Sequence, residues 1–310
     1  MEIFSQLLNA LPGSVSQGLI WGIMAIGVYL TYRILDVADL TVDGSFATGG
    51  AVAVVLILNG CNLWVAMLAA FIAGLLAGAI TGLLHTLMGI PPILAGILTQ
   101  LSLYSINLKI MGRANLSVNV NQTDLLISLR WVKDFAVHNP LITVGIVLAL
   151  LIGALYWFFG TEMGCAIRAT GANLHMSRAQ GINTNFNKVL GIMISNGLVA
   201  FSGAFLCQYQ GFADVKMGQG AIVIGLAAVI IGEALLGKIF KNFALRLLSV
   251  AIGSIIYYIV IQTVVTLGLD ANLLKLLSAV IVAVFLAVPY WKRQYSQTHM
   301  KKWKGGKAHA

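Results

Sequence analysis

The side chains most able to do chemistry in this chain are polar residues placed within long apolar runs. Gln100, Tyr104 and Asn107 are spaced i, i+4 and i+7, so they share one face of a helix. Three further candidates lie elsewhere in the sequence: Asp43 and Ser45, which are neighbours, and Asn196. Polar groups are costly in hydrocarbon, so we expect these residues to line a path for a polar solute. The alternative is that they join helices through hydrogen bonds of about 0.6 kcal/mol each.

A polar loop over 161–188 separates two apolar runs and carries one acid, three bases and several amide side chains. Such a segment must lie in water. Gly171 and Gly181 bracket a stretch, 172–180, that is able to form a short helix, and glycine permits sharp entry and exit turns. A compact polar helix between two apolar segments indicates a contact with another protein.

The composition requires these residues to be positioned by membrane helices. Hydrophobic residues make up 59% of the chain and charged residues 9%, against about 25% charged residues in soluble domains. The stretch 44–108 has no Lys, Arg, Asp or Glu, and a span needs about 20 apolar residues. The apolar runs are continuous, whereas a transmembrane barrel shows alternating segments of about 10 residues. Helices therefore fit better.

The apolar runs predict an all-α, polytopic membrane bundle of about nine transmembrane helices, within a range of eight to ten, that forms one domain over 1–310. The stretch 41–59 begins beside Asp43 and is rich in glycine, so we expect a broken or partial helix there. An amphipathic surface helix is expected within 125–135. We expect spans near 13–33, 41–59, 63–87, 91–111, 140–160, 189–209, 218–237, 244–266 and 274–291.

Lys and Arg residues predict the orientation, because cytoplasmic loops carry an excess of them. With nine spans and a cytoplasmic C-terminus, most of the 19 basic residues fall inside. We therefore expect the N-terminus outside and the loop 161–188 and the tail 292–310 in the cytoplasm. The net charge of +9 then reflects topology and a basic tail suited to anionic lipid headgroups, and it does not indicate nucleic acid.

Other patterns limit the function. Gly74, Gly78 and Gly82 recur every four residues, a spacing that lets two helices approach closely. The three cysteines follow no metal-binding pattern, so no metal is expected. The sequence has no Gly-rich loop that would hold a nucleotide phosphate. We therefore expect no enzyme activity, and no ATP hydrolysis, in this chain.

The loop resembles the ATPase-coupling loop of permease subunits in the branched-chain amino acid and ribose ABC importer family. That loop reads T-x-x-G-x-x-x-R-A-x-G-x-N, followed by Gly-Ile. The matching residues are Thr161, Gly164, Arg168, Ala169, Gly171, Asn173, Gly181 and Ile182. A second segment, 39–46, is similar to motifs of both the sugar and the amino-acid members. It differs from each motif at Asp43. The resemblance covers about 13–290 and is greatest to a subgroup paired with binding proteins for aromatic amino acids.

The resemblance implies a type II ABC importer permease in the bacterial inner membrane. It implies a homodimer around a central path, with a solute-binding protein outside and two ATPase subunits inside. The helix 172–180 would sit in a groove of the ATPase, where Arg168 and Arg178 could pair with acids. ATP and Mg²⁺ would bind the ATPase, so no cofactor is expected here.

The sequence leaves the solute open. We expect a small polar solute, an amino acid of the aromatic or branched-chain class. A sugar or nucleoside importer of the same architecture is the first alternative. An ion-coupled secondary transporter and a non-transporting membrane receptor are alternatives of other classes. Few carboxylates lie within the apolar runs, which disfavours ion coupling.

Overall fold

A computed structural model describes residues 2–118, 125–129, 132 and 139–268, together with several single positions between 273 and 287. The regular secondary structure of this part of the chain is helical apart from one short ribbon, in which β1 (Asn115–Ser117) pairs antiparallel with β2 (Phe212–Asp214). The helices are α1 (Glu2–Tyr29), the π-helical turn η1 (Leu30–Ile34), α2 (Val42–Leu58), α3 (Leu63–Thr86), α4 (Pro92–Met111), α5 (Pro140–Gly160), α6 (Glu162–Ala172), α7 (Leu174–Ala179), α8 (Thr184–Gln210), α9 (Ala221–Leu236) and α10 (Phe243–Thr266).

The all-α membrane class is confirmed, and eight of the nine expected spans fall on described helices, of which six are long and apolar enough to cross a membrane. These six are α1 with η1, α3, α4, α5, α8 and α10. Two apolar helices are shorter, because α2 has 17 residues and α9 has 16. A helix of 17 residues is about 26 Å long, less than the hydrocarbon thickness of about 30 Å. The expected ninth span, 274–291, and the tail 292–310 lie largely outside the described residues.

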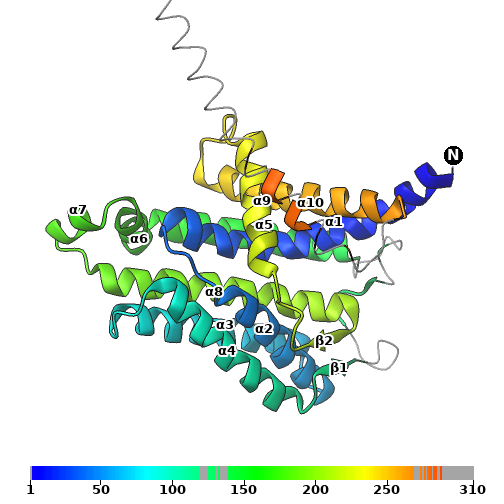
Figure 1. Ribbon diagram of the computed structural model, residues 1–310, viewed down its shortest axis with the longest axis horizontal. Coiled ribbons are helices and arrows are strands. Elements are labelled where there is room, and N and C mark those ends of the chain that lie inside the picture. The colour runs from blue at the N-terminus through cyan, green and yellow to red at the C-terminus, as the bar shows by residue number, and fades with distance from the viewer. Residues whose placement is uncertain are drawn as a thin grey trace, which may run out of the picture.

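The two short helices begin inside the bundle. The Thr41 hydroxyl, at the start of α2, lies 2.7 Å from the Thr81 hydroxyl of α3. The Asp43 carboxylate accepts hydrogen bonds from the backbone N–H groups of Gly220 and Ile222, at the start of α9. The N-termini of α2 and α9 therefore meet at Asp43. Figure 1 shows α9, in yellow, crossing the other helices steeply. The partial helix expected at 41–59 is present, whereas a full span at 218–237 is not.

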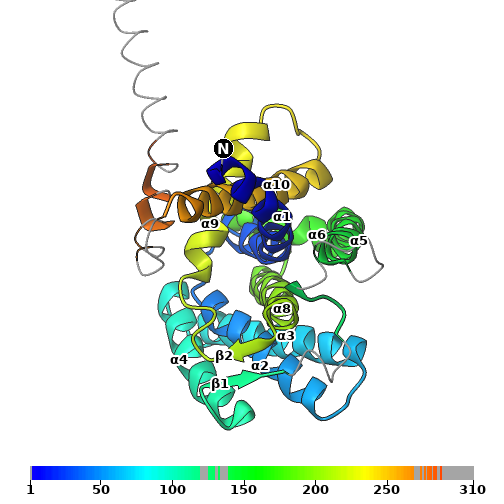
Figure 2. The same cartoon turned by 90° about the vertical axis from the view of Figure 1, so that its right-hand side faces the viewer.

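Helix α8 occupies the centre of the bundle. Figure 2 shows α8 between α1 on one side and α2 and α3 on the other. The Ser195 hydroxyl of α8 donates a hydrogen bond of 2.7 Å to the Gly27 carbonyl of α1. On the opposite face, a Cβ at Gly49 of α2 would overlap the Ala200 carbonyl. Helix α10 packs on α1, where the Ser254 hydroxyl donates to the Gly18 carbonyl. These contacts bring helix backbones together without intervening side chains.

The contact between α3 and α8 uses the glycine repeat. Gly74, Gly78 and Gly82 all face the α8 backbone. A Cβ at Gly78 would lie 2.6 Å from the Ile192 carbonyl oxygen and 2.8 Å from the Met193 Cα. Those distances are shorter than van der Waals contact, so only glycine fits without movement of one helix.

The segment 125–129 differs from the amphipathic surface helix expected within 125–135. Residues 125–128 are not helical, and Leu125 and Ile127 are buried in the bundle core. The backbone N–H of Leu126 donates to the Gln208 side chain at 3.1 Å. Apolar burial has therefore drawn this segment into the bundle, where a side chain replaces the missing helical acceptor. The rest of the expected helix, apart from Val132, falls outside the described residues.

A single added methyl group tests the α3–α8 contact. We expect Gly78→Ala to lower the thermal midpoint of the purified protein, since overpacking costs about 1–3 kcal/mol. Gly145→Ala is the matched control, because a Cβ there would meet nothing within 4 Å among the described residues. Equal thermal midpoints for the two variants would contradict this contact.

Candidate functional site

A cluster of buried hydrogen bonds lies at the middle of α8. The Asn196 side-chain N–H donates to the Asp39 carboxylate at 2.6 Å and to the Ile192 carbonyl at 3.0 Å. Its amide oxygen accepts from the Ser45 hydroxyl at 2.7 Å. Asp39 also accepts from the Thr41 backbone N–H at 2.9 Å. Asp39, Ser45 and Asn196 are buried, so this cluster holds α8 to the start of α2.

A chain of hydroxyl groups continues from this cluster. The Thr81 hydroxyl of α3 lies 2.7 Å from that of Thr41 and donates to that of Thr99, on α4, at 2.8 Å. All three threonines are buried. Gly96, one turn before Thr99, lets α4 approach the backbone of Leu40 and Thr41. Four elements thus meet in one hydrogen-bonded core: the start of α2, α3, α4 and α8.

Asp43 has a structural role that its place in the sequence did not show. Its two carboxylate oxygens accept from Gly220 N–H at 2.9 Å and from Ile222 N–H at 3.0 Å. These N–H groups belong to the first turn of α9 and have no partner within the helix. The negative charge also suits the positive end of the helix dipole. Asp43 therefore caps α9 from the first turn of α2.

The expected stripe on α4 has unequal exposure. Tyr104 is 42% exposed, Gln100 is half-buried and Asn107 is fully buried. The inward face of α4 instead runs through Thr99, Leu103 and Asn107, with Gln100 and Tyr104 at its edge. Among the described residues, neither amide atom of Asn107 has a hydrogen-bond partner. A buried amide without a partner is costly, so Asn107 is suited to a water molecule or a polar solute.

The sequence interpretation missed the Asp39 carboxylate and the three threonines as site residues. Asp39 carried a signal, because it is an acid within the apolar sequence Val37–Ala38–Asp39–Leu40. The threonines carried none. A threonine in a helix can return its hydroxyl to the preceding turn, as Thr99 does, so its type alone does not predict a contact between helices.

The polar loop forms two helices rather than one. Residues 174–179 form α7, which confirms the short helix expected over 172–180 with slightly narrower bounds, and residues 162–172 form a further helix, α6, that the sequence did not predict. Asn173 separates them with an extended φ of −157°, and its side chain accepts from the Met176 N–H. Gly181 has a φ of +79°, so it makes the expected exit turn. Gly171 lies inside α6, where a Cβ would overlap the Ile34 carbonyl, so it does not make the entry turn.

The other residues of the loop motif hold α6 against the end of α5. The Thr161 hydroxyl donates to the Phe158 carbonyl at 2.6 Å and accepts from the Gly164 N–H at 3.4 Å. Gly164 packs on the backbone of Phe158 and Phe159, where a Cβ would overlap both residues. Ala169 is half-buried. Within the described chain, most of the motif therefore shapes the hairpin itself.

Both arginines of the loop contact their own chain. The Arg168 guanidinium lies over the Phe243 ring of α10, 5.6 Å from its centroid. The Arg178 Nε donates to the Thr184 hydroxyl at 3.1 Å, which joins α7 to the first turn of α8. The surface of α7 remains exposed, with Met176 at 62%. Figure 1 shows α7 projecting from one end of the bundle.

The fold and the site together define a polytopic membrane protein with a buried polar core and a projecting helical hairpin. A family model described as "Branched-chain amino acid transport system / permease component" matches residues 11–289. The chain belongs to this family of transport-system permease components, as its loop motif suggested.

Individual relatives agree with this assignment. The chain is similar to a tyrosine transport system permease protein of Clostridioides difficile (strain R20291), with 37% identity over 95% of this chain and 96% of that protein. The fructose import permease FruF of Bifidobacterium longum is 29% identical over 88% of this chain and 75% of its own. The ribose import permease RbsC of Escherichia coli (strain K12) is 25% identical over 91% of this chain and 85% of that protein.

A solved structure supports the fold. An inward-facing metal-chelate type ABC transporter aligns with a TM-score of 0.50 at 14% identity, over 94% of this chain and 89% of that one. At this identity the likeness concerns the arrangement of helices alone.

The polar cluster predicts a large effect of losing one amide. Asn196→Ala removes one partner of the buried Asp39 carboxylate and the acceptor of Ser45, so we expect a loss of about 1–3 kcal/mol. The decrease would be measured as a lowered thermal midpoint. Asn185→Ala, at an exposed position in the first turn of the same helix, is the control. A loss of similar size in both variants would show that the buried contacts are not the cause.

Proposed function

We propose that this chain forms the translocation path of an ATP-driven importer for a small polar solute, an amino acid. One observation carries the proposal: the hairpin α6–α7 runs directly into α8, whose middle holds the buried polar cluster. A partner that moves α7 would therefore act on the centre of the bundle through one continuous helix.

The contacts of α8 make this transmission physically reasonable. Gly78 and Gly49 bring α3 and α2 onto the α8 backbone, so α8 cannot shift along its axis without moving them. Its Arg178–Thr184 contact joins it to α7 at 3.1 Å. A small displacement of α7 would thus change the position of Asn196 relative to Asp39. Packed helix interfaces convert such shifts into discrete rearrangements.

The proposed partners follow from the family and from exposed surfaces. Separate ATPase subunits would bind ATP with Mg²⁺ and contact the projecting α7 through Met176 and its neighbours. Thr161, Gly164, Arg168, Ala169, Gly171 and Asn173 would hold the hairpin in shape. A solute-binding protein on the opposite side and a second copy of the permease would complete the assembly in a bacterial inner membrane.

The charge distribution supports an orientation. Basic residues gather near the hairpin end of the bundle, on η1, α6, α7, the turn before α10 and the starts of α8 and α10: Arg33, Arg168, Arg178, Lys188, Lys241 and Arg246. Cytoplasmic surfaces of membrane proteins favour Lys and Arg. The proposed topology therefore places the hairpin and the C-terminus in the cytoplasm.

The proposed path runs along the inward face of α4 and the start of α2. Asn107 supports it, because its buried amide lacks a partner among the described residues and a passing solute or water would supply one. Gln100 and Tyr104, at the edge of that face, would contact the solute. Asp43, Ser45 and Asn196 would keep the wall of the path in place through their hydrogen bonds.

The proposed solute is an amino acid with an aromatic side chain. The support is the relative named as a tyrosine permease, which is 37% identical, compared with 29% and 25% for the fructose and ribose permeases. A sugar remains the second candidate because those relatives also cover most of the chain.

Uptake into proteoliposomes tests both the energy source and the solute. The permease would be reconstituted with its ATPase and its binding protein, and labelled tyrosine and ribose would be offered separately. We expect tyrosine uptake only when ATP is present on the side of the membrane that the hairpin faces. Uptake driven by an ion gradient without ATP would support the secondary transporter instead, and ribose uptake alone would support the sugar importer.

One substitution tests the contact of α7 with the ATPase. We expect Met176→Glu to reduce uptake about fivefold or more while ATP hydrolysis continues, since a central interface residue contributes more than about 1 kcal/mol. Met88→Glu, at a 68% exposed methionine between α3 and α4, is the control and should transport normally. Normal ATP-coupled uptake by the α7 variant would disprove this contact.

A further inference from the structure

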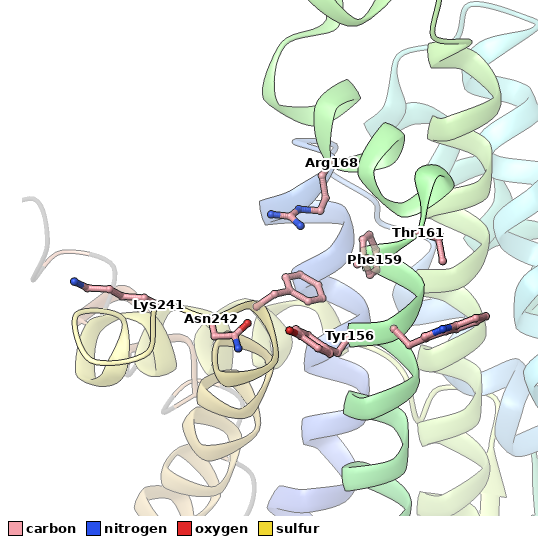
Figure 3. A pocket seen from close by; sticks show the side chains of 9 residues that line it. Tyr156, Phe159, Thr161, Arg168, Lys241 and Asn242 are labelled. Carbon is pink, nitrogen blue, oxygen red and sulfur yellow. The ribbon is translucent and has the colours of Figure 1, made fainter.

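A groove lined by aromatic and basic residues lies where α5 ends, α6 passes and α10 begins. Its volume is about 610 Å³. Figure 3 shows the Arg168 guanidinium directed from α6 toward the turn that carries Lys241 and Asn242, with Tyr156 of α5 below it. Thr161 and Phe159 form the end near α5. The groove therefore presents cationic and amide donors above an aromatic floor.

A second groove of about 630 Å³ adjoins the first, and the two share Arg168 and Phe243. It adds the guanidinium groups of Arg33 and Arg246. None of the described residues that line either groove is acidic. Glu233, at the edge, is already paired with Arg33 at 3.1 Å. The Arg33–Glu233 pair leaves Arg168, Arg246 and Lys241 without an acidic neighbour among the described residues that line the grooves, so the paired grooves carry an excess of positive charge.

The first groove opens beside a helix surface suited to lipid. Only 17% of the most apolar part of α5 is buried, the lowest value among the six long helices of the described chain, and Figure 2 shows α5 at the outer edge of the bundle. Ile146 and Leu150 of α5 are 57% and 69% exposed, and Trp157 follows at 74%. Exposed Trp and Tyr residues near a helix end are typical of the membrane–water boundary.

We propose that this groove binds the phosphate of an anionic phospholipid. Arg168 would contact the phosphate, because a guanidinium group is a strong donor to phosphate oxygens. Lys241, whose ammonium group Figure 3 shows directed away from Arg168, would attract the lipid through its charge. The acyl chains would follow the exposed apolar face of α5 toward Ile146. Such a lipid would join α6 to the start of α10, so it would stabilise the base of the hairpin. The charge and the neighbouring apolar face favour a lipid over a soluble anion or an acidic protein segment.

Native mass spectrometry of the purified permease tests the lipid. The protein would be extracted from nanodiscs that contain either phosphatidylglycerol or phosphatidylcholine. We expect retained phosphatidylglycerol, reduced about fivefold for each lost charge in Arg168→Gln and Lys241→Gln, since a basic residue near an anionic surface contributes about 1 kcal/mol. Lys216→Gln removes an exposed base next to β2 and should retain the lipid. Equal retention of both lipids, or by all variants, would overturn the proposal.

A variant that fills the groove without changing its charge tests whether the lipid occupies the groove itself. Gly160 lines the groove, and a Cβ there would meet nothing within 4 Å among the described residues. Gly160→Leu should therefore fold normally and displace the lipid, whereas Gly145→Leu, at an equally open site on the same helix, should not. Displacement of the lipid by inorganic phosphate would assign the groove to a soluble anion. Loss of a co-purifying ATPase with full lipid retention would assign it to a protein contact. Either result would overturn the lipid proposal.

Discussion

The hydrogen bond between Asn196 and Asp39, 2.6 Å long and fully buried, is the contact on which the centre of this protein depends. In an apolar bundle a carboxylate and an amide require partners, and these two satisfy each other across α8 and the start of α2. Ser45 and Thr41 complete the cluster. One side of the non-helical segment before α2 can pack into the bundle because the polar groups on that side are used in this way.

The same requirement explains why two helices are short. α2 and α9 both begin within the bundle, where each first turn exposes N–H groups that lack acceptors. Asp43 supplies acceptors to α9, and Asp39 supplies one to Thr41. Asp39 and Asp43, four residues apart, thus stabilise the starts of two helices that begin inside the bundle. Membrane transporters use interrupted helices to place polar groups at depth without exposing backbone to lipid.

The glycine contacts and the hairpin provide the routes by which a movement of α7 would reach the polar core. Gly78 and Gly49 hold α3 and α2 directly on the α8 backbone, and α7 continues into α8 through the turn at Gly181. Arg168 acts at the other end of the hairpin, where it lies on Phe243 of α10. A force on α7 would therefore reach the polar core through α8 and would reach α10 through α6. Lipid in the groove beside Arg168 would stiffen the second route.

The family and the class of the fold were predictable from sequence, because hydrophobicity and a loop motif are properties of residue type and spacing. Most helix boundaries followed as well, since continuous apolar runs end where polar residues or Gly and Pro begin. The break at Asn173 was missed although asparagine is a preferred N-cap residue, and the structure shows its side chain accepting from the Met176 N–H at the start of α7. The stripe of Gln100, Tyr104 and Asn107 on α4 was only partly correct. The spacing identifies a shared helix face, but packing decides that Asn107 is buried and Tyr104 exposed.

Residue types and their spacing alone therefore determined that this is a helical membrane permease with a polar loop that follows α5. Only the tertiary structure decided which polar side chains meet. Asp39 and Asn196 are 157 positions apart, and Asp43 reaches Gly220 across 177. Pairing at such separations depends on which helix faces come into contact, and the backbone approach at glycines such as Gly74 and Gly78 sets those faces.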